Sequence, residues 1–444
     1  MIFPRLLLAL ALVPQVQSYR ISGRQLPCEG YRMRIAADGR VEVSSADAAG
    51  AFYARKTLKQ LGTVMRRMEI EDWPAYRWRG IHLDESRHFF GKEYVKRLIR
   101  RMADYKFNIL HWHLMDESGW RLEIPRYPEV ARSGAVRTMK KGGTWIRDVE
   151  NGVYGPFFYT ADDVREVLAV AKENFVTVVP EIEMPGHAWI ILNKCYPHFA
   201  CNPKDPGGVF CLGNDEGLKF LEKVIDYVAD VFPGPYVHIG GDEVDRSCWS
   251  KCERCQSKAR ELGLVGTDML QNWATHQFAV FLSKKGKRAI GWDEIADGPD
   301  LPQSVVVMDW CGKGRGPRAA ASGHDVVLCH HEYCYLDYTQ GLKEDPIPYR
   351  IAEPCLPLEK VYSFDIDKII PEEYHARILG GQCCNWTEFT CTPEELEWKL
   401  WPRAYAVAEN LWTAPKHKDF AEFIKRLESL RLCIDKGNHW ENVK

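Results

Sequence analysis

Residues 160–184 read TADDVREVLAVAKENFVTVVPEIEM. Thr160 followed by acidic residues is a helix N-cap signal, and apolar residues then recur at helical spacing over residues 162–174. The next stretch, residues 176–184, is a short apolar run, which indicates a buried strand. An amphipathic helix followed by a buried strand is the repeating unit of an α/β fold.

The same alternation continues in both directions along the chain. Further helices are predicted over residues 92–105, 216–231 and 268–285, and another, behind the cap Thr392, over residues 393–411. The apolar runs that we expect to form strands are residues 78–84, 107–114, 176–184, 236–243, 288–295, 304–310, 325–334 and 378–386. Eight strands alternating with helices predict a (β/α)8 TIM barrel, which we expect to occupy residues 76–444.

The residues before the barrel suggest export and a small folded unit. The apolar run at residues 6–13, behind Arg5, predicts a signal peptide over residues 1–18, although a buried strand or helix is the alternative. We therefore expect an exported protein, secreted or periplasmic, or lysosomal in a eukaryote. Within residues 19–75, alternation around Asp38-Gly39 predicts a hairpin, and helical spacing over residues 48–68 predicts one helix. This small α+β unit should pack on the barrel, because it is too small to be stable alone.

The composition excludes some classes of partner. The 444 residues include 59 basic and 61 acidic side chains, so the formal charge is 59 − 61 = −2. Binding to nucleic acid or to an anionic membrane requires clustered basic residues, and we expect neither. Apart from the predicted signal, no span is long enough to cross a bilayer, so no membrane span is predicted. Residues 312–316, GKGRG, lack the spacing of a phosphate-binding loop.

Carboxylates and indoles follow the predicted strands, at the ends where barrels carry their functional groups. Aromatic faces stack on a sugar ring, while carboxylates bind its hydroxyls and transfer protons. In VHIGGDEV, residues 237–244, Asp242 and Glu243 are adjacent. Adjacent residues of a strand point to opposite faces, so the two carboxylates can reach one site only if the chain leaves the strand there. Gly240 and Gly241 permit such a turn. In most proteins such a pair is simply the start of a loop.

Ordered motifs from about Arg79 to Trp412 resemble those of glycoside hydrolase family 20, the β-N-acetylhexosaminidases. The segments that carry the resemblance are residues 79–80, 83–84, 87–89, 111–117, 119–121, 180–187, 238–243, 291–294, 335–337 and 386–388. The resemblance implies an exo-acting, retaining hydrolase that removes terminal non-reducing β-linked N-acetylglucosamine or N-acetylgalactosamine. The acetamido oxygen of the substrate would attack the anomeric carbon and form an oxazolinium-like intermediate. The substrate would be an N-acetylhexosamine-terminated oligosaccharide or glycoconjugate, and no cofactor is expected.

The resemblance also implies a role for individual residues. Glu243 would be the general acid and base, Asp242 would hold the acetamido N–H, and Tyr335 would bond the acetamido oxygen. We expect indole walls around Glu243 and the negative charge of Asp242 both to favour the protonated form of Glu243. The residues expected to bind substrate or to support the acid are Arg87, Asp116, His187, Trp292, Trp310, Asp337, Trp386 and Glu388, with Glu183 and His113 close behind.

Each of these residues also has an ordinary structural explanation. A single Trp is usually part of the core, and Arg87 could simply pair with Asp84 at the barrel rim. Two other functions stay open: a glycan-binding protein on the same fold that has lost catalysis, and a barrel glycosidase that uses two protein carboxylates. The oligomeric state is not predicted.

The 15 cysteines are an odd number, so at least one cannot pair within the chain. Cys201 and Cys211 follow the third predicted strand, and Cys252 and Cys255 follow the fourth, with Cys248 nearby. A structural zinc site on Cys201, Cys211, Cys252 and Cys255, a pair of disulfides, and free thiols all stay open. A catalytic metal on His111 and His113, or on His330 and His331, is disfavoured because the family mechanism needs none.

Overall fold

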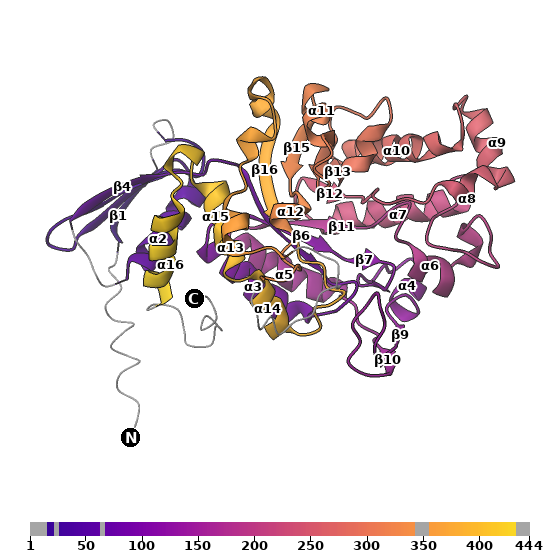
Figure 1. Ribbon diagram of the computed structural model, residues 1–444, viewed down its shortest axis with the longest axis horizontal. Coiled ribbons are helices and arrows are strands. Elements are labelled where there is room, and N and C mark those ends of the chain that lie inside the picture. Colours follow the sequence, from indigo (N-terminus) through magenta and orange to yellow (C-terminus); the bar gives the residue numbers. More distant parts are fainter. Residues whose placement is uncertain (1–15, 22–25, 63–66, 342–354, 432–444) are drawn as a thin grey trace.

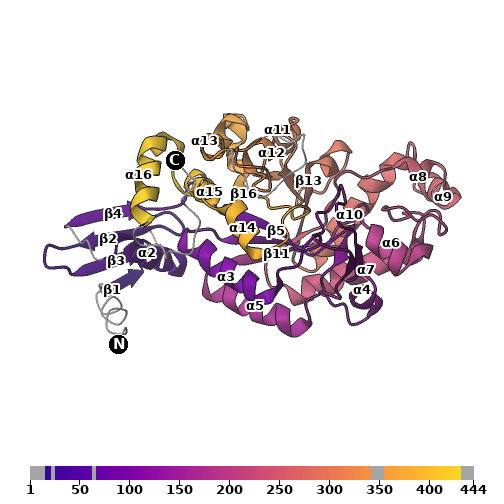
Figure 2. The same ribbon diagram turned by 60° about the horizontal axis from the view of Figure 1, so that its bottom comes forward.

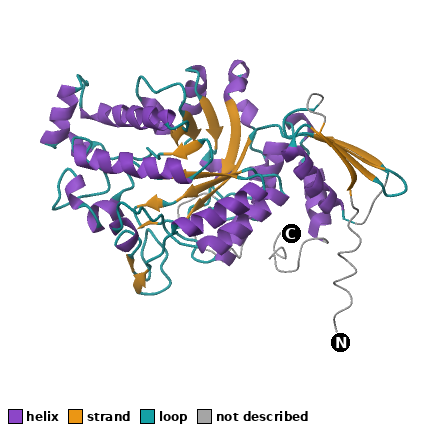
Figure 3. Cartoon of the chain, turned by 180° about the vertical axis from the view of Figure 1, so that it is seen from behind, coloured by secondary structure: helices purple, strands orange, loops and turns teal. Residues whose placement is uncertain are grey.

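A closed barrel of eight parallel strands forms the centre of the molecule (Figure 1). The computed structural model describes residues 16–21, 26–62, 67–341 and 355–431. The barrel strands, in order, are β5 (Trp78–Asp84), β6 (Ile109–His113), β11 (Thr177–Glu181), β12 (Tyr236–His238), β13 (Arg288–Trp292), β14 (Val306–Asp309), β15 (Asp325–Leu328) and β16 (Ile378–Cys383). Each of the eight predicted runs contains one of these strands, so the predicted TIM barrel is confirmed. Figure 3 shows helices around the strands, so the strands are buried on both faces.

The helices that alternate with the strands lie close to their predicted ranges. They are α3 (Gly91–Asp104), α5 (Ala161–Glu173), α7 (Asp215–Val231), α10 (Leu270–Lys284), α14 (Pro393–Leu400) and α15 (Arg403–Trp412). The single helix predicted over residues 393–411 is two helices, because Pro402 has no N–H for the helical ladder. The remaining helices are α4 (Glu129–Arg132), α6 (Trp189–Lys194), α8 (Ser247–Ser250), α9 (Glu253–Glu261), α11 (Arg315–Ala321), α12 (His331–Cys334), α13 (Leu358–Tyr362) and α16 (Phe420–Arg431).

Both predicted helix caps are present. The Thr160 hydroxyl accepts a hydrogen bond from the N–H of Asp163 at 3.2 Å, and the Asp163 carboxylate accepts one from the N–H of Thr160 at 2.9 Å. This reciprocal pair fixes the start of α5. The Thr392 hydroxyl accepts a bond from the N–H of Glu395 at 3.3 Å and caps α14. Among the residues described, no helix is both long and apolar enough to cross a membrane.

Two short antiparallel strand pairs lie in the segment between β6 and α5. They are β7 (Met115–Asp116) with β8 (Gly119–Trp120), and β9 (Arg137–Met139) with β10 (Gly152–Tyr154). The β7–β8 pair begins two residues beyond β6 and contains Asp116, so it holds that carboxylate at the end of the barrel.

A four-stranded sheet with one helix precedes the barrel. Its strands, in the spatial order β1-β3-β2-β4, are β1 (Val16–Ile21), β3 (Val41–Ser45), β2 (Tyr31–Ile35) and β4 (Met68–Asp72), and the helix is α2 (Ala48–Leu61). The predicted hairpin is the antiparallel pair β2–β3. The predicted helix is too long, because it ends at Leu61 before Gly62, and Met68 begins a strand. The predicted cleavage after Ser18 falls inside β1, residues 1–15 lie outside the described residues, and the signal peptide stays a prediction.

The small sheet is held to the barrel by partly buried polar contacts. Asp72 of β4 accepts hydrogen bonds from Tyr31 of β2 at 2.7 Å, from Lys106 at 2.8 Å and from the indole of Trp412 at 2.7 Å. Lys106 lies just before β6, and Trp412 ends α15, so one carboxylate joins three parts of the chain. Figure 2 shows the sheet at one end of the molecule and α8 and α9 at the other.

Candidate active site

The chain leaves the barrel wall immediately after β12, in the turn that carries Asp242 and Glu243. Gly240 and Gly241 have φ of +66° and +102°, and Glu243 has φ of +48°. A Cβ on Gly240 would lie 1.7 Å from Oε2 of Glu183, and one on Gly241 would lie 2.5 Å from Cγ2 of Ile295. Only glycine fits at these two positions. The turn therefore has the form that the sequence predicts.

A continuous chain of charged side chains crosses the ends of the strands. Nη2 of Arg87 lies 2.8 Å from Oδ2 of Asp116, and Nη1 lies 3.5 Å from Oε1 of Glu388. Nδ1 of His187 lies 3.1 Å from Oδ1 of Asp116, and Nε2 lies 3.4 Å from Oδ2 of Asp242. These five predicted residues follow five different barrel strands, β5, β6, β11, β12 and β16, and meet in one place.

Arg87 also makes the structural contact with Asp84 that the sequence left open, beside its contacts with Asp116 and Glu388. Its Nη1 donates to Oδ2 of Asp84 at 3.1 Å, as an ordinary rim ion pair would. The Asp84 carboxylate also accepts bonds from the backbone N–H groups of Ser86 at 2.8 Å and Thr387 at 3.0 Å. Asp84 thus anchors both the loop after β5 and the loop after β16, and it leaves the other guanidinium nitrogen of Arg87 directed at Asp116.

The charges of this chain depend on one another. Burial opposes a charge on His187, but the carboxylates of Asp116 and Asp242 hold its pKa well above the ordinary value. Burial would likewise raise the pKa of Asp116, yet Arg87 and His187 hold it well below the ordinary value. Burial raises the pKa of Asp242 to about 7, against the attraction of His187 and with the repulsion of Glu294. The positively charged imidazolium of His187 thus lies between two carboxylates. Asp116 stays ionised, whereas the pKa of Asp242 lies near neutrality.

Glu243 is the most exposed of the predicted catalytic residues. Its side chain is 63% exposed, and Oε2 lies 3.8 Å from Nε2 of His187. Glu243 and His187 both have φ of +48°, a backbone conformation that costs energy for residues other than glycine and that gathers at functional sites. A side chain exposed to this extent is not enclosed by indole rings, so the expectation of indole walls around Glu243 is not met.

The predicted aromatic residues form a connected set of rings. The ring centroids of Trp292 and Trp386 are 5.9 Å apart, those of Trp386 and Tyr335 are 6.2 Å apart, and those of Tyr335 and Trp310 are 6.1 Å apart. Arg87 lies 5.2 Å over the ring of Trp386, which joins the aromatic set to the charged chain. The indole N–H groups of Trp292 and Trp310 donate to Glu183 at 3.3 Å and Glu294 at 3.1 Å, so carboxylates fix the orientation of both rings.

Tyr335 and Asp337 stand just beyond α12. Both are buried, and Tyr335 is bridged to Cys384 next to β16, which brings it to the Trp386 loop. Asp337 follows two residues later, and its backbone carbonyl accepts a bond from Lys399 at 2.7 Å.

Sequence reasoning missed a buried cluster beneath the site. The carboxylate of Glu181, at the end of β11, contacts His113, lies 3.1 Å from Nε2 of His111 and lies 2.7 Å from Nδ1 of His238. Nε2 of His82 is 3.9 Å from the same carboxylate. All five side chains are fully buried. One signal could have found them: His111 and His113 are two apart on β6 and so share its inner face, and Glu181 is paired with His113 on the neighbouring strand β11.

The cluster is coupled to the charged chain of the site through His113, which contacts both Glu181 and Asp116. Burial lowers the pKa of His111 to about 4, whereas for His113 the carboxylates of Glu181 and Asp116 overcome burial and raise the pKa to about 10. Nε2 of His113 is 2.9 Å from Asp116. His113 is therefore a cation that joins the buried Glu181 to the charged chain.

The other histidine pair named by the sequence does not converge on one point. His330 lies 2.9 Å from Asp309, and His331 lies 3.1 Å from the hydroxyl of Tyr338. The four cysteines of the possible zinc site, in contrast, do come together, with all four sulfurs within 4.8 Å of one another.

Models of known protein families match most of the chain. Residues 76–415 match the family model described as glycosyl hydrolase family 20, catalytic domain, and residues 9–73 match domain 2 of the same family. A beta-hexosaminidase of Porphyromonas gingivalis is 39% identical over 92% of this chain and 54% of its own length, and one of Vibrio furnissii is 32% identical over 83% and 63%. The chain thus spans between half and two thirds of the length of these relatives.

Solved structures give the same result. The exo beta-N-acetylglucosaminidase of Vibrio harveyi in complex with N-acetylglucosamine has a TM-score of 0.83 at 31% identity and covers 93% of this chain and 67% of its own. The beta-N-acetylhexosaminidase of Bacteroides fragilis has a TM-score of 0.81 at 32% identity, with coverages of 94% and 83%. With a family model matched over most of its length, the chain belongs to glycosyl hydrolase family 20.

Proposed function

We propose that this chain is an exo-acting β-N-acetylhexosaminidase that hydrolyses terminal non-reducing β-linked N-acetylglucosamine or N-acetylgalactosamine from oligosaccharides or glycoconjugates. The observation that carries the proposal is that Asp242 and Glu243, adjacent in sequence, both face His187, at 3.4 and 3.8 Å, at the end of the barrel. Two such carboxylates on one turn suit a reaction in which one transfers a proton and the other orients the substrate. They do not suit a nucleophile and an acid on opposite sides of a sugar.

In the proposed first step, the acetamido oxygen of the substrate forms a bond to the anomeric carbon while the glycosidic C–O bond breaks. The carboxyl group of Glu243 donates its proton to the leaving oxygen. Asp242 accepts the acetamido N–H, whose positive charge grows as the oxazolinium ring closes. Tyr335 donates to the acetamido oxygen and holds it in line for attack.

In the second step, the Glu243 carboxylate takes a proton from a water molecule, which attacks the anomeric carbon and opens the ring. Two inversions at one carbon give a product with retained configuration. The rings of Trp292, Trp310 and Trp386 would surround the acetamido methyl group, and burial of apolar surface would hold it there. Neither of these two reaction steps requires a metal or an organic cofactor.

The remaining residues would bind the terminal sugar or support the acid. Arg87, Asp337 and Glu388 are largely buried and would bind hydroxyls of a single ring, which is why the proposed action is exo. Asp116 and His187 would set the charge beside Asp242. The partner of this site is therefore a neutral amino sugar at a chain end.

The test is a substrate panel with the full chain. We expect release of aryl alcohol from an N-acetyl-β-glucosaminide or an N-acetyl-β-galactosaminide, with the β-anomer as first product by NMR, and none from the plain β-glucoside. Successive fluorination of the acetamido methyl should slow the reaction progressively, because it weakens the carbonyl oxygen as a nucleophile. Glu243→Gln should lower kcat by at least about a hundredfold.

Three results would contradict the proposal. Equal hydrolysis of the plain glucoside would favour two protein carboxylates, and binding of the N-acetylhexosaminides without release would favour a glycan-binding protein. Near-normal turnover by Glu243→Gln would remove Glu243 from its role.

Export is proposed separately, from the apolar run at residues 6–13 behind Arg5. N-terminal sequencing of the protein recovered outside the cytoplasm would test it. A mature chain that begins at Tyr19 would have lost Val16, Gln17 and Ser18, the first three residues of β1. The whole strand is kept only if cleavage occurs before Val16 or does not occur.

A further inference from the structure

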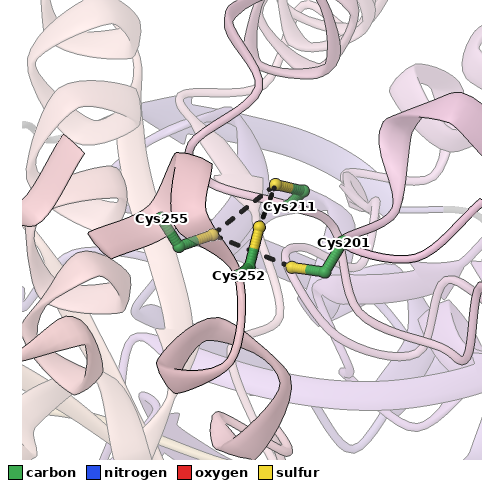
Figure 4. Close-up of side chains that lie close together, drawn as sticks. All are labelled: Cys201, Cys211, Cys252 and Cys255. Carbon is green, nitrogen blue, oxygen red and sulfur yellow. Dashed lines mark hydrogen bonds between the residues drawn. The ribbon is translucent and has the colours of Figure 1, made fainter. Parts of the chain in front are cut away.

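Four cysteines from two separate segments come together near the end of the molecule formed by α8 and α9 (Figures 2 and 4). Cys201 and Cys211 lie in the loop between β11 and α7, Cys252 directly precedes α9, and Cys255 lies in its first turn. We call these four residues the tetracysteine cluster. Cys211, Cys252 and Cys255 are buried, and Cys201 is half-buried. None of the cysteines that the structure describes forms a disulfide.

The sulfur atoms of the cluster surround a common point instead of forming two pairs. Sγ of Cys211 lies 3.7 Å from that of Cys252 and 3.5 Å from that of Cys255, and Cys255 lies in turn 3.7 Å from Cys201. Four thiolates bound to one zinc ion at about 2.3 Å occupy the corners of a tetrahedron with edges of about 3.8 Å. Paired cysteines would instead give each sulfur one partner at about 2.05 Å.

The backbone that presents these sulfurs is built by contacts that do not involve them. Ala200 and Phe210 form an antiparallel bridge, and the N–H of Cys211 donates to the carbonyl of Phe199 at 2.9 Å, which sets Cys201 and Cys211 side by side. A Cβ on Gly213 would lie 2.3 Å from the carbonyl carbon of Arg254 and 2.4 Å from the nitrogen of Cys255. Only glycine allows this loop to approach the start of α9 so closely.

Two further side chains join the segments and favour negative charge between them. The indole N–H of Trp249, a fully buried residue, donates to the carbonyl of Phe210 at 3.0 Å. The guanidinium of Arg254 donates to the carbonyl of Ala200 at 2.7 Å and brings a positive charge beside the thiols. The N-terminus of α9, a helix of nine residues, adds its dipole with the same sign.

We propose that the tetracysteine cluster binds one zinc ion as a structural site. Soft thiolates in a tetrahedral set select zinc among the divalent ions that prefer this geometry. With four protein ligands the ion has no open position for water or substrate, so its role is structural and not catalytic. Cys248, whose thiol donates to the carbonyl of Asp245 at 3.6 Å, lies outside the set.

The zinc ion would hold two segments of the active site together. The loop that carries Cys211 is bonded to the His187 turn, from the N–H of Phe210 to Pro185 at 2.9 Å and from the N–H of Ala188 to Gly208 at 2.9 Å. The helix that carries Cys255 continues from the Glu243 turn through α8. Zinc would thus connect the backbone on either side of the contact between His187 and Glu243.

The test measures metal in the full chain purified under reducing conditions without added chelator. We expect about one zinc per chain by elemental mass spectrometry, released in step with modification of four thiols by a mercurial reagent. Protein reconstituted with Co²⁺ should show the thiolate charge-transfer absorption and the intense visible bands of tetrahedral cobalt. Cys252→Ser and Cys255→Ser should retain less than about a tenth of the zinc, because three thiolates bind it far more weakly.

Cys248→Ser is the matched control, since it removes a neighbouring thiol and should leave the zinc content unchanged. Loss of zinc from this variant would overturn the assignment of the four ligands. Disulfides among Cys201, Cys211, Cys252 and Cys255 in peptide mapping would overturn the proposal, as would zinc-free wild-type protein with four free thiols. Because the cobalt spectrum and metal content are measured on the wild-type chain, a variant that fails to fold leaves the test intact, and neither readout depends on the enzymatic activity.

Discussion

Nε2 of His187 lies 3.4 Å from Oδ2 of Asp242, so a cation faces the carboxylate that we propose to orient the substrate. On its other side His187 contacts Asp116, which stays ionised beside Arg87. The imidazolium therefore links the charges proposed to bind the sugar to the proposed catalytic turn.

The first prediction concerns the acid limb of the pH profile. Asp242 must be ionised to accept the acetamido N–H, and burial raises its pKa to about 7, so kcat/KM should fall as pH drops through that value. The His187 cation lowers the pKa of Asp242. His187→Gln should thus move the acid limb to higher pH, by about one unit.

Glu183→Gln is the control for this shift. Burial, with repulsion from Asp242, raises the pKa of Glu183 well above its ordinary value, so the residue is neutral and glutamine keeps its charge and an oxygen acceptor for the indole of Trp292. The acid limb of this variant should stay in place. An unmoved limb in His187→Gln, or an equal movement in both variants, would disprove the link between His187 and Asp242.

The second prediction concerns the turn after β12. Gly240→Ala forces a side chain into φ of +66° and places its Cβ 1.7 Å from the buried Glu183 carboxylate. We expect a loss of unfolding free energy clearly above the roughly 1 to 2 kcal/mol that left-handed backbone alone costs. Gly286→Ala, at φ of +72° with no atom within 4 Å of the added Cβ, measures that backbone cost. Equal urea midpoints for the two variants would show that the clash with Glu183 is relieved without cost.

The barrel was predictable because its signals are local. Each strand is a short apolar run and the long helices between strands have their own periodicity or their own cap, as Thr160 shows with Asp163. The helices α11, α12 and α13 were not predicted, because seven residues or fewer are too short to show a helical period. The N-terminal unit was predicted less well for the same reason. Met68 fits a helical spacing when only neighbours are considered, yet it pairs with Ile35 in a sheet, a contact between residues far apart in sequence.

The site was predictable to the extent that its residues follow strand ends or recur in family motifs. The resemblance named Asp242, Glu243 and His187, but it could not give the direction of the Glu243 side chain, which depends on the turn at Gly240 and Gly241. The Glu181 cluster was missed because its members come from four strands, β5, β6, β11 and β12, which only the folded barrel brings together.

The third prediction concerns Tyr335. Its buried hydroxyl is proposed to hold the acetamido oxygen, so Tyr335→Phe should lower kcat by roughly tenfold to a hundredfold while the fold is kept. Tyr338→Phe removes a hydroxyl of the same loop that contacts His331 at 3.1 Å, and its kcat should stay near the wild-type value. Equal losses in both variants would indicate a general disturbance of the loop and would contradict the specific role of Tyr335.

The fourth prediction concerns Arg87, whose guanidinium contacts three carboxylates at once: Asp84 at 3.1 Å, Asp116 at 2.8 Å and Glu388 at 3.5 Å. An ammonium group cannot span these positions, so Arg87→Lys should loosen the residues proposed to bind the sugar hydroxyls. Because these contacts exist in both ground and transition states, we expect KM to rise about tenfold while kcat changes less than about threefold.

Arg101→Lys is the matched control, because Arg101 pairs with Glu397 between α3 and α14 and should leave both constants unchanged. A fall in kcat with unchanged KM in Arg87→Lys would place Arg87 in the chemical step and overturn its assignment to ground-state binding. The two constants measured on one aryl N-acetylhexosaminide distinguish these outcomes, because a uniform binding contact raises KM alone, whereas a contact made only in the transition state lowers kcat and kcat/KM together.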